Sequence, residues 1–263
     1  MAHLFCVSNQ KGGVGKTTVS INIAGALNQL GRDVLLVDLD PQGSATEGLG
    51  FIDAYDVNPP SLFDLLTDPS QRKEVGSIIC SHPEMDVLPS NIDMTAVEPE
   101  LTLSRRACEQ LSLTLEPLES EYDFIIVDSP PNLGLLTDNA LYATQNVLIP
   151  ALAESTSKRA LELLFDHIES IELEFDIDIK ERGVVANRVE PTNEADHMLE
   201  WIGEAFSDTP IWEVRKRVDL QRAFSQGGSI FDYKPDLDMA AVFLTIGRSI
   251  SSQFAAIDQE ATA

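Results

Sequence analysis

The chain has 263 residues, of which 43% are hydrophobic and 23% are charged, and this composition excludes a disordered or membrane-embedded protein. It carries 43 acidic and 18 basic residues, which gives a formal net charge of -25. Its cysteines, Cys6, Cys80 and Cys108, are isolated and lack CxxC spacing, which excludes a disulfide framework or a zinc site.

Segments that predict strands alternate with segments of helical periodicity along the chain. The predicted strands are Leu4–Val7, Val34–Val37, Met85–Leu88, Phe124–Val127, Val147–Ile149 and Val184–Ala186. The predicted helices are Thr17–Leu30, ended by Gly31, a helix within Met94–Leu115, and one around Ser157–Leu173. The proline-containing stretch Asp53–Pro83 is expected to be a loop with one or two short helices.

The predicted strands are continuous apolar runs rather than alternating ones. Such runs are typical of strands that are buried on both faces of a parallel sheet. Because crossovers between parallel strands are right-handed, helices then cover both faces. We therefore expect a doubly wound, mostly parallel α/β sheet in a single domain over residues 1–263.

A glycine-rich segment, KGGVGKTT, lies between the first predicted strand and the first predicted helix. Polyphosphate binding requires several backbone N–H groups directed into one concavity, a helix N-terminus behind them and a cation nearby. Lys16 can reach the outer phosphates, and the hydroxyl of Thr17 can bind Mg²⁺. The segment therefore predicts a P-loop that binds Mg²⁺–ATP through Lys11, Gly12, Gly13, Val14, Gly15, Lys16, Thr17 and Thr18.

Carboxylates follow two of the predicted strands. Asp128 ends the run from Phe124 to Val127, as a Walker B carboxylate that holds Mg²⁺ does, and a turn or helix-capping role is compatible with that function. Asp38 and Asp40 lie in the segment DLDPQ, where turn carboxylates are the alternative to catalytic ones.

Together these segments resemble the ParA/MinD/nitrogenase-iron-protein group of ATPases. The position of the first glycine in a standard loop is Gln10 here, and Lys11 opens the loop as in the deviant Walker A motif of that group. The resemblance implies a nucleotide-sandwich homodimer in which Lys11 reaches the partner's phosphates and Gly12 lies where the subunits approach each other. The site is then shared between two subunits.

The resemblance also implies roles for individual side chains. It makes Asp40 the residue that orients or deprotonates the attacking water, with Lys11 and Lys16 as the catalytic cations. Asp38 would support the Mg²⁺ shell beside Thr17 and Asp128. Asn187, at the end of a late strand, would read the adenine edge, whereas a lone asparagine there is otherwise a turn residue.

Five segments resemble the ParA/Soj partition ATPases most closely: SNQKGGVGKTT, VLLVDLDPQGSAT, YDFIIVDSPPNLG, GVVANRV and PIWEVRKRVDLQRAFSQGGSIFDY. In that family ATP drives dimerisation, the dimer binds DNA nonspecifically, and a ParB-like partner stimulates hydrolysis. The resemblance implies a switch in chromosome or plasmid partition or in cargo positioning.

A cluster of cations stands out in this acidic chain. Nonspecific DNA binding depends on Lys and Arg side chains that neutralise phosphates. The candidate residues are Arg215, Lys216, Arg217 and Arg222, joined after dimerisation by Arg188, Lys158 and Arg159. The alternative is a local ion-pair cluster in which Glu213 and Asp219 neutralise them.

Three other functions are weighed against partition. A MinD-like membrane cycle needs a basic amphipathic tail, but Met239–Ala263 carries only Arg248 as a cation and predicts a helix packed on the core through Val242, Phe243, Ile246 and Ile250. An iron protein needs cysteines in matching segments, which are absent. A nucleotide-gated scaffold for a protein cargo remains, although Asp40 argues against an inactive one.

The acidic surplus has two interpretations. A negative field attracts a basic partner, whereas dense surface carboxylates keep a protein soluble in a very salty cytoplasm. The acids are spread from Asp33 to Glu260, which favours the second interpretation and a halophilic source. The N-terminus MAHLFCVSN predicts a strand rather than a signal peptide, and no apolar run reaches the length of a spanning helix, so we expect a cytoplasmic protein without stable membrane insertion.

Overall fold

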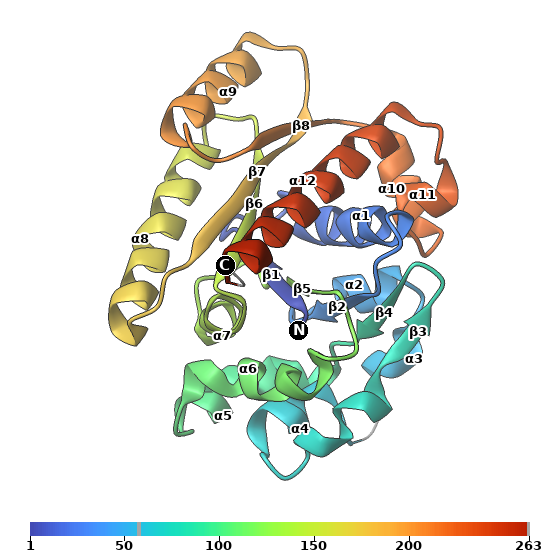
Figure 1. The fold of residues 1–263 in the computed structure, drawn as a ribbon, viewed down its shortest axis with the longest axis vertical. Coiled ribbons are helices and arrows are strands. Elements are labelled where there is room, and N and C mark those ends of the chain that lie inside the picture. Colours follow the sequence, from blue (N-terminus) through green and yellow to red (C-terminus); the bar gives the residue numbers. More distant parts are fainter. Residues whose placement is uncertain (57–58, 262–263) are drawn as a thin grey trace.

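A computed structural model describes residues 1–56 and 59–261 of the chain. In these residues eight strands form one sheet in the order β3-β4-β2-β5-β1-β6-β7-β8 (Figure 1). The strands are β1 (His3–Val7), β2 (Val34–Asp38), β3 (Cys80–His82), β4 (Met85–Leu88), β5 (Phe124–Asp128), β6 (Asn146–Leu152), β7 (Lys180–Val189) and β8 (Ile211–Arg215). Neighbouring strands are parallel except in the antiparallel pair β3–β4. The predicted doubly wound, mostly parallel α/β fold is confirmed.

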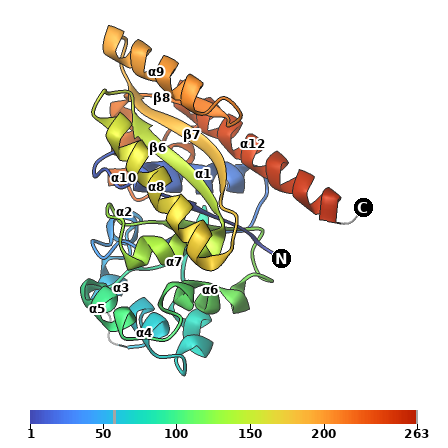
Figure 2. The same cartoon turned by 90° about the vertical axis from the view of Figure 1, so that its left-hand side faces the viewer.

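Helices cover both faces of the sheet. They are α1 (Lys16–Gln29), α2 (Ser44–Gly48), α3 (Ile52–Tyr55), α4 (Leu62–Thr67), α5 (Val97–Thr102), α6 (Gln110–Leu115), α7 (Leu135–Thr144), α8 (Ser157–Phe175), α9 (Asn193–Ala205), α10 (Val218–Ser225), α11 (Ile230–Tyr233) and α12 (Asp238–Ala261). Short 3₁₀ helices are η1 (Arg72–Ile78), η2 (Ile92–Ala96), η3 (Ala107–Glu109) and η4 (Glu116–Leu118). Figure 2 shows α8 over β6 and β7, with α12 beyond them.

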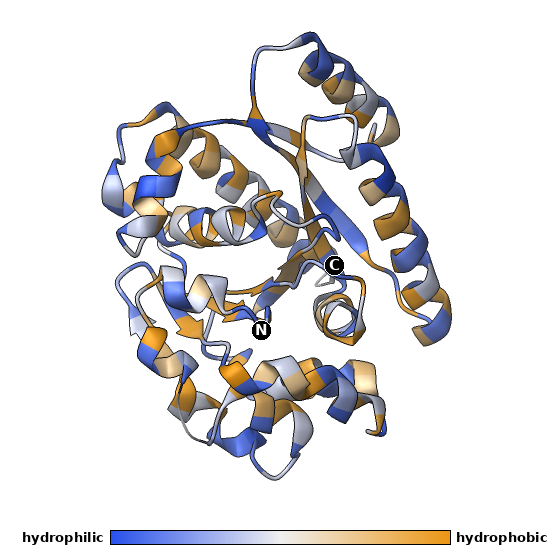
Figure 3. Ribbon diagram, turned by 180° about the vertical axis from the view of Figure 1, so that it is seen from behind, coloured by the Kyte–Doolittle hydropathy of each residue, from blue (hydrophilic) through white to orange (hydrophobic). Residues whose placement is uncertain are grey.

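The core is divided into two layers by the sheet. Alternate residues of β5 enter different layers: Phe124 and Ile126 pack with α1 and α12, whereas Ile125 and Val127 pack with α4 to α8. All five residues of β5 are buried, as are all five of β2. The central strands are accordingly mainly orange in Figure 3, whereas β7 is blue at its charged start and the helices show both colours. Burial on both faces explains why these strands read as continuous apolar runs.

The predicted segments agree with the structure except at two places. The helix expected within Met94–Leu115 is present as two helices, α5 and α6, which are separated by a turn that contains Arg106 with a φ of 61°. The side-chain amide of Gln110 donates to the carbonyls of Arg105 and Arg106 and stabilises this turn. The stretch Asp53–Pro83 contains short helices, as expected, but also the strand β3; its residues 57–58 lie outside the described residues.

The C-terminal tail forms α12 and packs on α1. Phe243, Ile246 and Ile250 are fully buried there, and a Cβ placed on Gly247 would lie 3.0 Å from the Cβ of Ala26. Within the described residues, the segment Asp238–Gln259 alone has the length and composition of a membrane-spanning helix. Its packing confirms the predicted core helix; residues 262–263 of the predicted tail lie outside the described residues.

The order of the strands places a topological switch point beside β1. The chain leaves β1 toward β2 and β4, returns to insert β5 between β2 and β1, and then builds outward in the other direction through β6, β7 and β8. In open α/β sheets, ligands bind at the carboxyl ends of the strands next to such a point. The glycine-rich segment follows β1 at that place.

Candidate functional site

Three strands bring their carboxyl ends to the same level at the switch point. Val7 of β1 and Asp38 of β2 both pair in register with Asp128 of β5, which lies between them. The hydrogen-bonding of the sheet, rather than a flexible loop, therefore holds the two carboxylates beside the start of the phosphate loop. The structure brings together the predicted Lys16, Thr17, Asp38 and Asp128.

The glycine loop requires glycine at two positions. Gly13 and Gly15 have φ values of 74° and 91°, in the left-handed region that side chains rarely adopt. A Cβ on Gly15 would lie 2.3 Å from Nδ2 of Asn187, so its hydrogen also makes room for that side chain. Gly12 and Gly13 are exposed, and Val14 is buried. Helix α1 begins at Lys16 directly behind the loop, which is the arrangement that binds phosphate.

Lys16 is buried at the base of the loop. Its Nζ donates to the carbonyl oxygen of Asn9 at 3.1 Å. Burial lowers the pKa of Lys16, while the nearby carboxylates of Asp128 and Asp40 oppose this shift. The ammonium therefore lies in a desolvated position, where its attraction for a bound anion is strong.

Asp128 is fully buried and accepts hydrogen bonds from two hydroxyls of α1. Its Oδ2 lies 2.7 Å from Oγ1 of Thr17, and its Oδ1 lies 2.9 Å from Oγ of Ser20. Burial raises the pKa of Asp128 to about 6, against the effect of these two donors and of Lys16. The predicted metal pair Thr17 and Asp128 is thus in direct contact.

Asp38 is also fully buried, and its two oxygens are used unequally. Oδ2 accepts hydrogen bonds from the backbone N–H and the hydroxyl of Thr46, each at 2.7 Å. Oδ1 has no hydrogen-bond partner among the described residues. Burial, and next the charge of Asp128, raises the pKa of Asp38 to about 7. A buried oxygen without a donor is one that a bound cation or water would satisfy.

Asp40 lies at the edge of the site and is half-buried. Its Oδ1 accepts from the N–H of Gln42 at 3.0 Å, and its carbonyl oxygen accepts from the hydroxyl of Ser90 at 2.8 Å. Tyr55 fixes the next residue by donating from its hydroxyl to the carbonyl of Pro41 at 2.7 Å. Burial raises the pKa of Asp40, while Gln42 and Lys16 act in the opposite direction.

Lys11 binds within its own chain in this structure. Its Nζ lies 2.6 Å from Oγ1 of Thr156 and 3.4 Å from both Glu154 and Ser157, in the segment that follows β6. The predicted contact with a partner's phosphates stays a prediction. It requires Lys11 to leave these three contacts; those with Thr156 and Glu154 are exposed, and the one with the buried Ser157 is partly buried.

Asn187 contacts the glycine loop. Its Nδ2 donates to the carbonyl of Val14 at 2.7 Å, and its Oδ1 accepts from the N–H of Arg188. Both ends of the amide are therefore bonded within the chain, and recognition of adenine by Asn187 stays a prediction.

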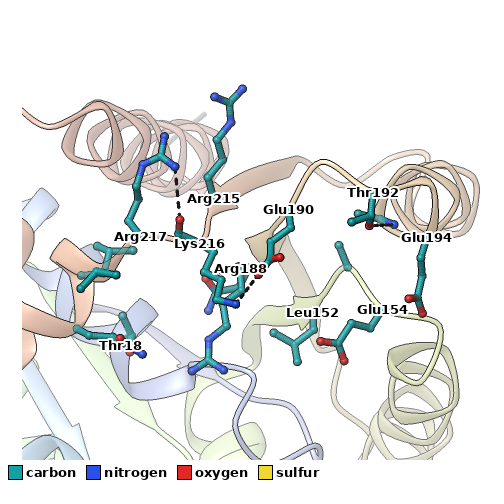
Figure 4. Close-up of a pocket in the computed structure, with 16 residues that line it drawn as sticks. Thr18, Leu152, Glu154, Arg188, Glu190, Thr192, Glu194, Arg215, Lys216 and Arg217 are labelled. Carbon is teal, nitrogen blue, oxygen red and sulfur yellow. Dashed lines mark hydrogen bonds and ion pairs between the residues drawn. The ribbon is translucent and has the colours of Figure 1, made fainter.

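A pocket of about 360 Å³ opens between the ends of β6, β7 and β8, next to Thr18 and Asn187. Figure 4 shows Arg188, Arg215, Lys216 and Arg217 on one side of it, opposite Glu154 and Glu194. Three of the four predicted DNA-binding residues therefore line one pocket. Arg222, on α10, is not among the residues that line it.

Most of these cations are already paired with carboxylates. Lys216 pairs with Glu190, and Arg217 pairs with Asp238. Arg222 lies 3.9 Å from Asp219, as the ion-pair alternative predicted. Arg215 belongs to β8 and pairs with Val189 through the backbone, but its side chain makes no hydrogen bond or ion pair with the described residues, and Figure 4 shows it directed away from the pocket.

The site fits Mg²⁺ when phosphate oxygens complete the coordination. No group of three His, Cys, Asp or Glu side chains in the described residues could hold a metal alone. Mg²⁺ usually binds through one or two carboxylates together with substrate phosphates and waters. Thr17, Asp128 and the unpartnered Oδ1 of Asp38 supply ligands of this kind beside the phosphate loop.

Sequence reasoning missed three residues of the site: Ser20, Thr46 and Ser90. Ser20 lies one helical turn after Thr17, so the spacing could have indicated it. Thr46 lies in the segment VLLVDLDPQGSAT without an assigned role. Ser90 follows β4, and it reaches Asp40 because β4 lies beside β2 in the sheet.

Comparisons with known proteins give a consistent result. The family described as "AAA domain" matches residues 2–181. The chain is 36% identical over 256 residues to the sporulation initiation inhibitor protein Soj of Bacillus subtilis (strain 168), covering 96% of this chain and 99% of Soj. It is 33% identical over 256 residues to the chromosome partitioning protein ParA of Myxococcus xanthus (strain DK1622), covering 95% and 88%. The solved structure of cobyrinic acid a,c-diamide synthase from Mycobacterium smegmatis with bound ADP and magnesium is similar with a TM-score of 0.81, 27% identity and coverage of 97% and 96%.

Proposed function

The chain belongs to the ParA/Soj/MinD family of partition ATPases, and we propose that it is a slow, Mg²⁺-dependent ATPase whose ATP-bound form is a homodimer. The observation that carries this proposal is the convergence of Lys16, the Thr17–Asp128 pair and the unpartnered oxygen of Asp38 at one end of the sheet. Binding of ADP and magnesium by the similar synthase structure supports the same ligands here.

Each residue has a distinct part in the proposed hydrolysis. The loop N–H groups and Lys16 hold the phosphates, with Lys16 near the outer ones. Thr17, Asp128 and Asp38 would hold Mg²⁺, which would supply neutralising charge to the phosphates. Asp40 orients the attacking water; its Oδ2 accepts no hydrogen bond from the described residues, and its backbone is fixed by Ser90.

We assign the adenosine end of ATP to the pocket beside Thr18 and Asn187. The pocket continues from the phosphate loop along the ends of β7 and β8. For recognition of the base, the amide of Asn187 retains a second N–H and a second lone pair besides those bonded to the carbonyl of Val14 and the N–H of Arg188.

Dimerisation gives ATP a second function. The shortest contact of Lys11 and its one ion pair, to Thr156 and Glu154, are exposed, so the cost of releasing it is small. In the dimer it contacts the partner's phosphates, and ATP therefore acts as both substrate and switch. We propose that a single domain over residues 1–263 carries out this cycle in the cytoplasm.

The biological role proposed is partition of a chromosome or plasmid, or positioning of a cargo. It includes nonspecific DNA binding by the ATP dimer through Arg215, Lys216, Arg217 and Arg222, and a ParB-like activator. The resemblance to Soj and ParA supports this role, and the ion pairs of Lys216, Arg217 and Arg222 weaken the DNA contact. The packing of α12 on α1 disfavours a MinD-like membrane cycle.

The test combines turnover with assembly. Wild-type protein is expected to hydrolyse ATP slowly and only with Mg²⁺, whereas Asp40→Ala is expected to bind ATP and accumulate as a dimer in light scattering. A protein that remains monomeric with ATP in both forms contradicts the sandwich dimer. DNA co-sedimentation with ATP at the salt concentration of the cell tests the partition role, and binding to liposomes instead would support the membrane cycle.

A further inference from the structure

Asp38 is held by a single residue that supplies two donors. The backbone N–H and the hydroxyl of Thr46 both lie 2.7 Å from Oδ2 of Asp38. All of these groups are fully buried, so water does not compete with them. Because Oδ2 already accepts two hydrogen bonds, Oδ1 is the oxygen of Asp38 that is available to contact a ligand.

The direction of the Thr46 hydroxyl is set by a second residue. The N–H of Ser90 donates to Oγ1 of Thr46 at 2.9 Å. A threonine hydroxyl has one proton. Since Ser90 uses the hydroxyl as an acceptor, that proton remains for Oδ2 of Asp38. These hydrogen bonds therefore run in one direction: Ser90 donates to Thr46, and Thr46 donates to Asp38.

Ser90 also contacts the other carboxylate segment. Its hydroxyl donates to the carbonyl oxygen of Asp40 at 2.8 Å. One residue after β4 thus holds Asp38 through Thr46 and the backbone of Asp40 directly. Both carboxylates are therefore tied to the carboxyl ends of the neighbouring strands β2 and β4.

We propose that Thr46 and Ser90 are positioning residues of the ATPase site. Thr46 turns Asp38 so that Oδ1 serves the Mg²⁺–nucleotide complex, and Ser90 keeps Thr46 in its donating orientation and fixes Asp40. Neither residue touches substrate. The inference rests on the proposed function and assigns to it two residues that the phosphate-loop motif does not contain.

The test separates metal binding from turnover. Thr46→Val keeps the shape and the backbone donor but removes the hydroxyl. We expect it to need about tenfold more Mg²⁺ for half-maximal binding of a fluorescent ATP analogue, with kcat reduced about tenfold. Binding of the analogue without Mg²⁺ stays unchanged. Thr46→Ser keeps the hydroxyl and is expected to restore both values.

A second variant removes one of the two contacts of Ser90 and keeps the other. Ser90→Ala loses the hydrogen bond to the carbonyl of Asp40 but keeps the N–H that donates to Thr46. It is expected to lower kcat while leaving the Mg²⁺ dependence of binding as in wild type. This split does not arise from a general loss of stability.

Thr114→Val provides the matched control. Thr114 is fully buried on α6; its hydroxyl donates to the carbonyl of Gln110 at 2.8 Å and lies 3.3 Å from that of Leu65, outside the site. It is expected to lose stability without a change in Mg²⁺ dependence. Wild-type Mg²⁺ dependence and kcat in Thr46→Val would overturn the inference while leaving the proposed function intact. A loss that Thr46→Ser fails to restore also overturns it. Absence of Mg²⁺-dependent hydrolysis in the wild type overturns the proposed function itself.

Discussion

Asp38 and Asp128 lie directly opposite each other in the register of β2 and β5, and both side chains are fully buried. Burial raises their pKa values to about 7 and about 6, respectively. Two carboxylates so close together repel each other once both are ionised. A divalent cation beside them relieves the repulsion. The ionised pair is therefore more stable when a cation is bound than when the site is empty.

The first prediction concerns pH and stability. Between about pH 4 and 7 the folded, ligand-free protein binds more protons at Asp38 than the unfolded chain, because the pKa rises on folding from 3.8 to about 7. The contribution of Asp38 protonation to the free energy of unfolding is therefore fully present below about pH 4 and is lost as the pH rises to about 7. The loss is on the order of a few kcal/mol. Urea denaturation across this range measures the slope.

Asp38→Asn removes this titrating group and is expected to flatten the slope. Asp208→Asn, which changes an exposed carboxyl in the α9–β8 loop, is the control and should keep it. An unchanged slope in Asp38→Asn contradicts the prediction.

The second prediction concerns Gly15. Gly15→Ala places a side chain at a φ of 91° and against Asn187, so ATP binding should be lost and the free energy of unfolding should fall by about 2 kcal/mol. Gly203→Ala is the control, because Gly203 is exposed in α9 and an added Cβ meets nothing within 4 Å. Its free energy of unfolding should rise by up to about 1 kcal/mol, because alanine has a higher helix propensity than glycine. If Gly15→Ala and Gly203→Ala have the same ATP binding and the same free energy of unfolding, the prediction is contradicted.

The third prediction concerns Lys11. Lys11→Ala should retain ATP binding through Lys16 but fail to dimerise with ATP, as measured by light scattering. Its free energy of unfolding should change by less than about 1 kcal/mol, because the lost contacts are partly exposed. Lys73→Ala removes an exposed lysine of η1 and should dimerise normally. Normal dimerisation of Lys11→Ala contradicts the cross-subunit role.

The fourth prediction follows from the proposed DNA contact. Glu190→Gln frees Lys216, so affinity of the ATP dimer for DNA should rise by up to about fivefold, the equivalent of a surface ion pair of at most about 1 kcal/mol. Glu204→Gln changes the net charge equally but breaks no ion pair in the described residues. An equal rise in both variants, measured at one salt concentration, would point to overall charge instead of Lys216.

The sequence predicted the parts of the site that lie on continuous segments. Lys16 and Thr17 follow from the loop between a strand and a helix, and Asp128 follows from its place at the end of an apolar run. The contacts of Ser90 and Thr46 were not predictable in the same way, because they depend on β4 lying beside β2. Strand order is a tertiary property that periodicity does not encode.

The ion-pair partners of Lys216, Arg217 and Arg222 were likewise only partly predictable from the sequence. Sequence neighbours suggested Glu213 and Asp219, and Asp219 does lie near Arg222. Lys216 and Arg217 instead pair with Glu190, the residue after β7, and Asp238, the first residue of α12. The break at Arg106 was also missed, because a single left-handed residue leaves the apolar pattern on either side intact. A halophilic source stays a prediction.

The insertion of β5 between β1 and β2 has a consequence for how the protein matures. The phosphate loop and Asp38 are synthesised well before the strand that joins them, and β1 and β2 have no direct pairing to hold them in register. The complete site therefore forms only after β5 has entered the sheet. Mg²⁺–ATP, the ligand proposed for that site, is expected to stabilise chains that have completed this step over fragments that end before Phe124.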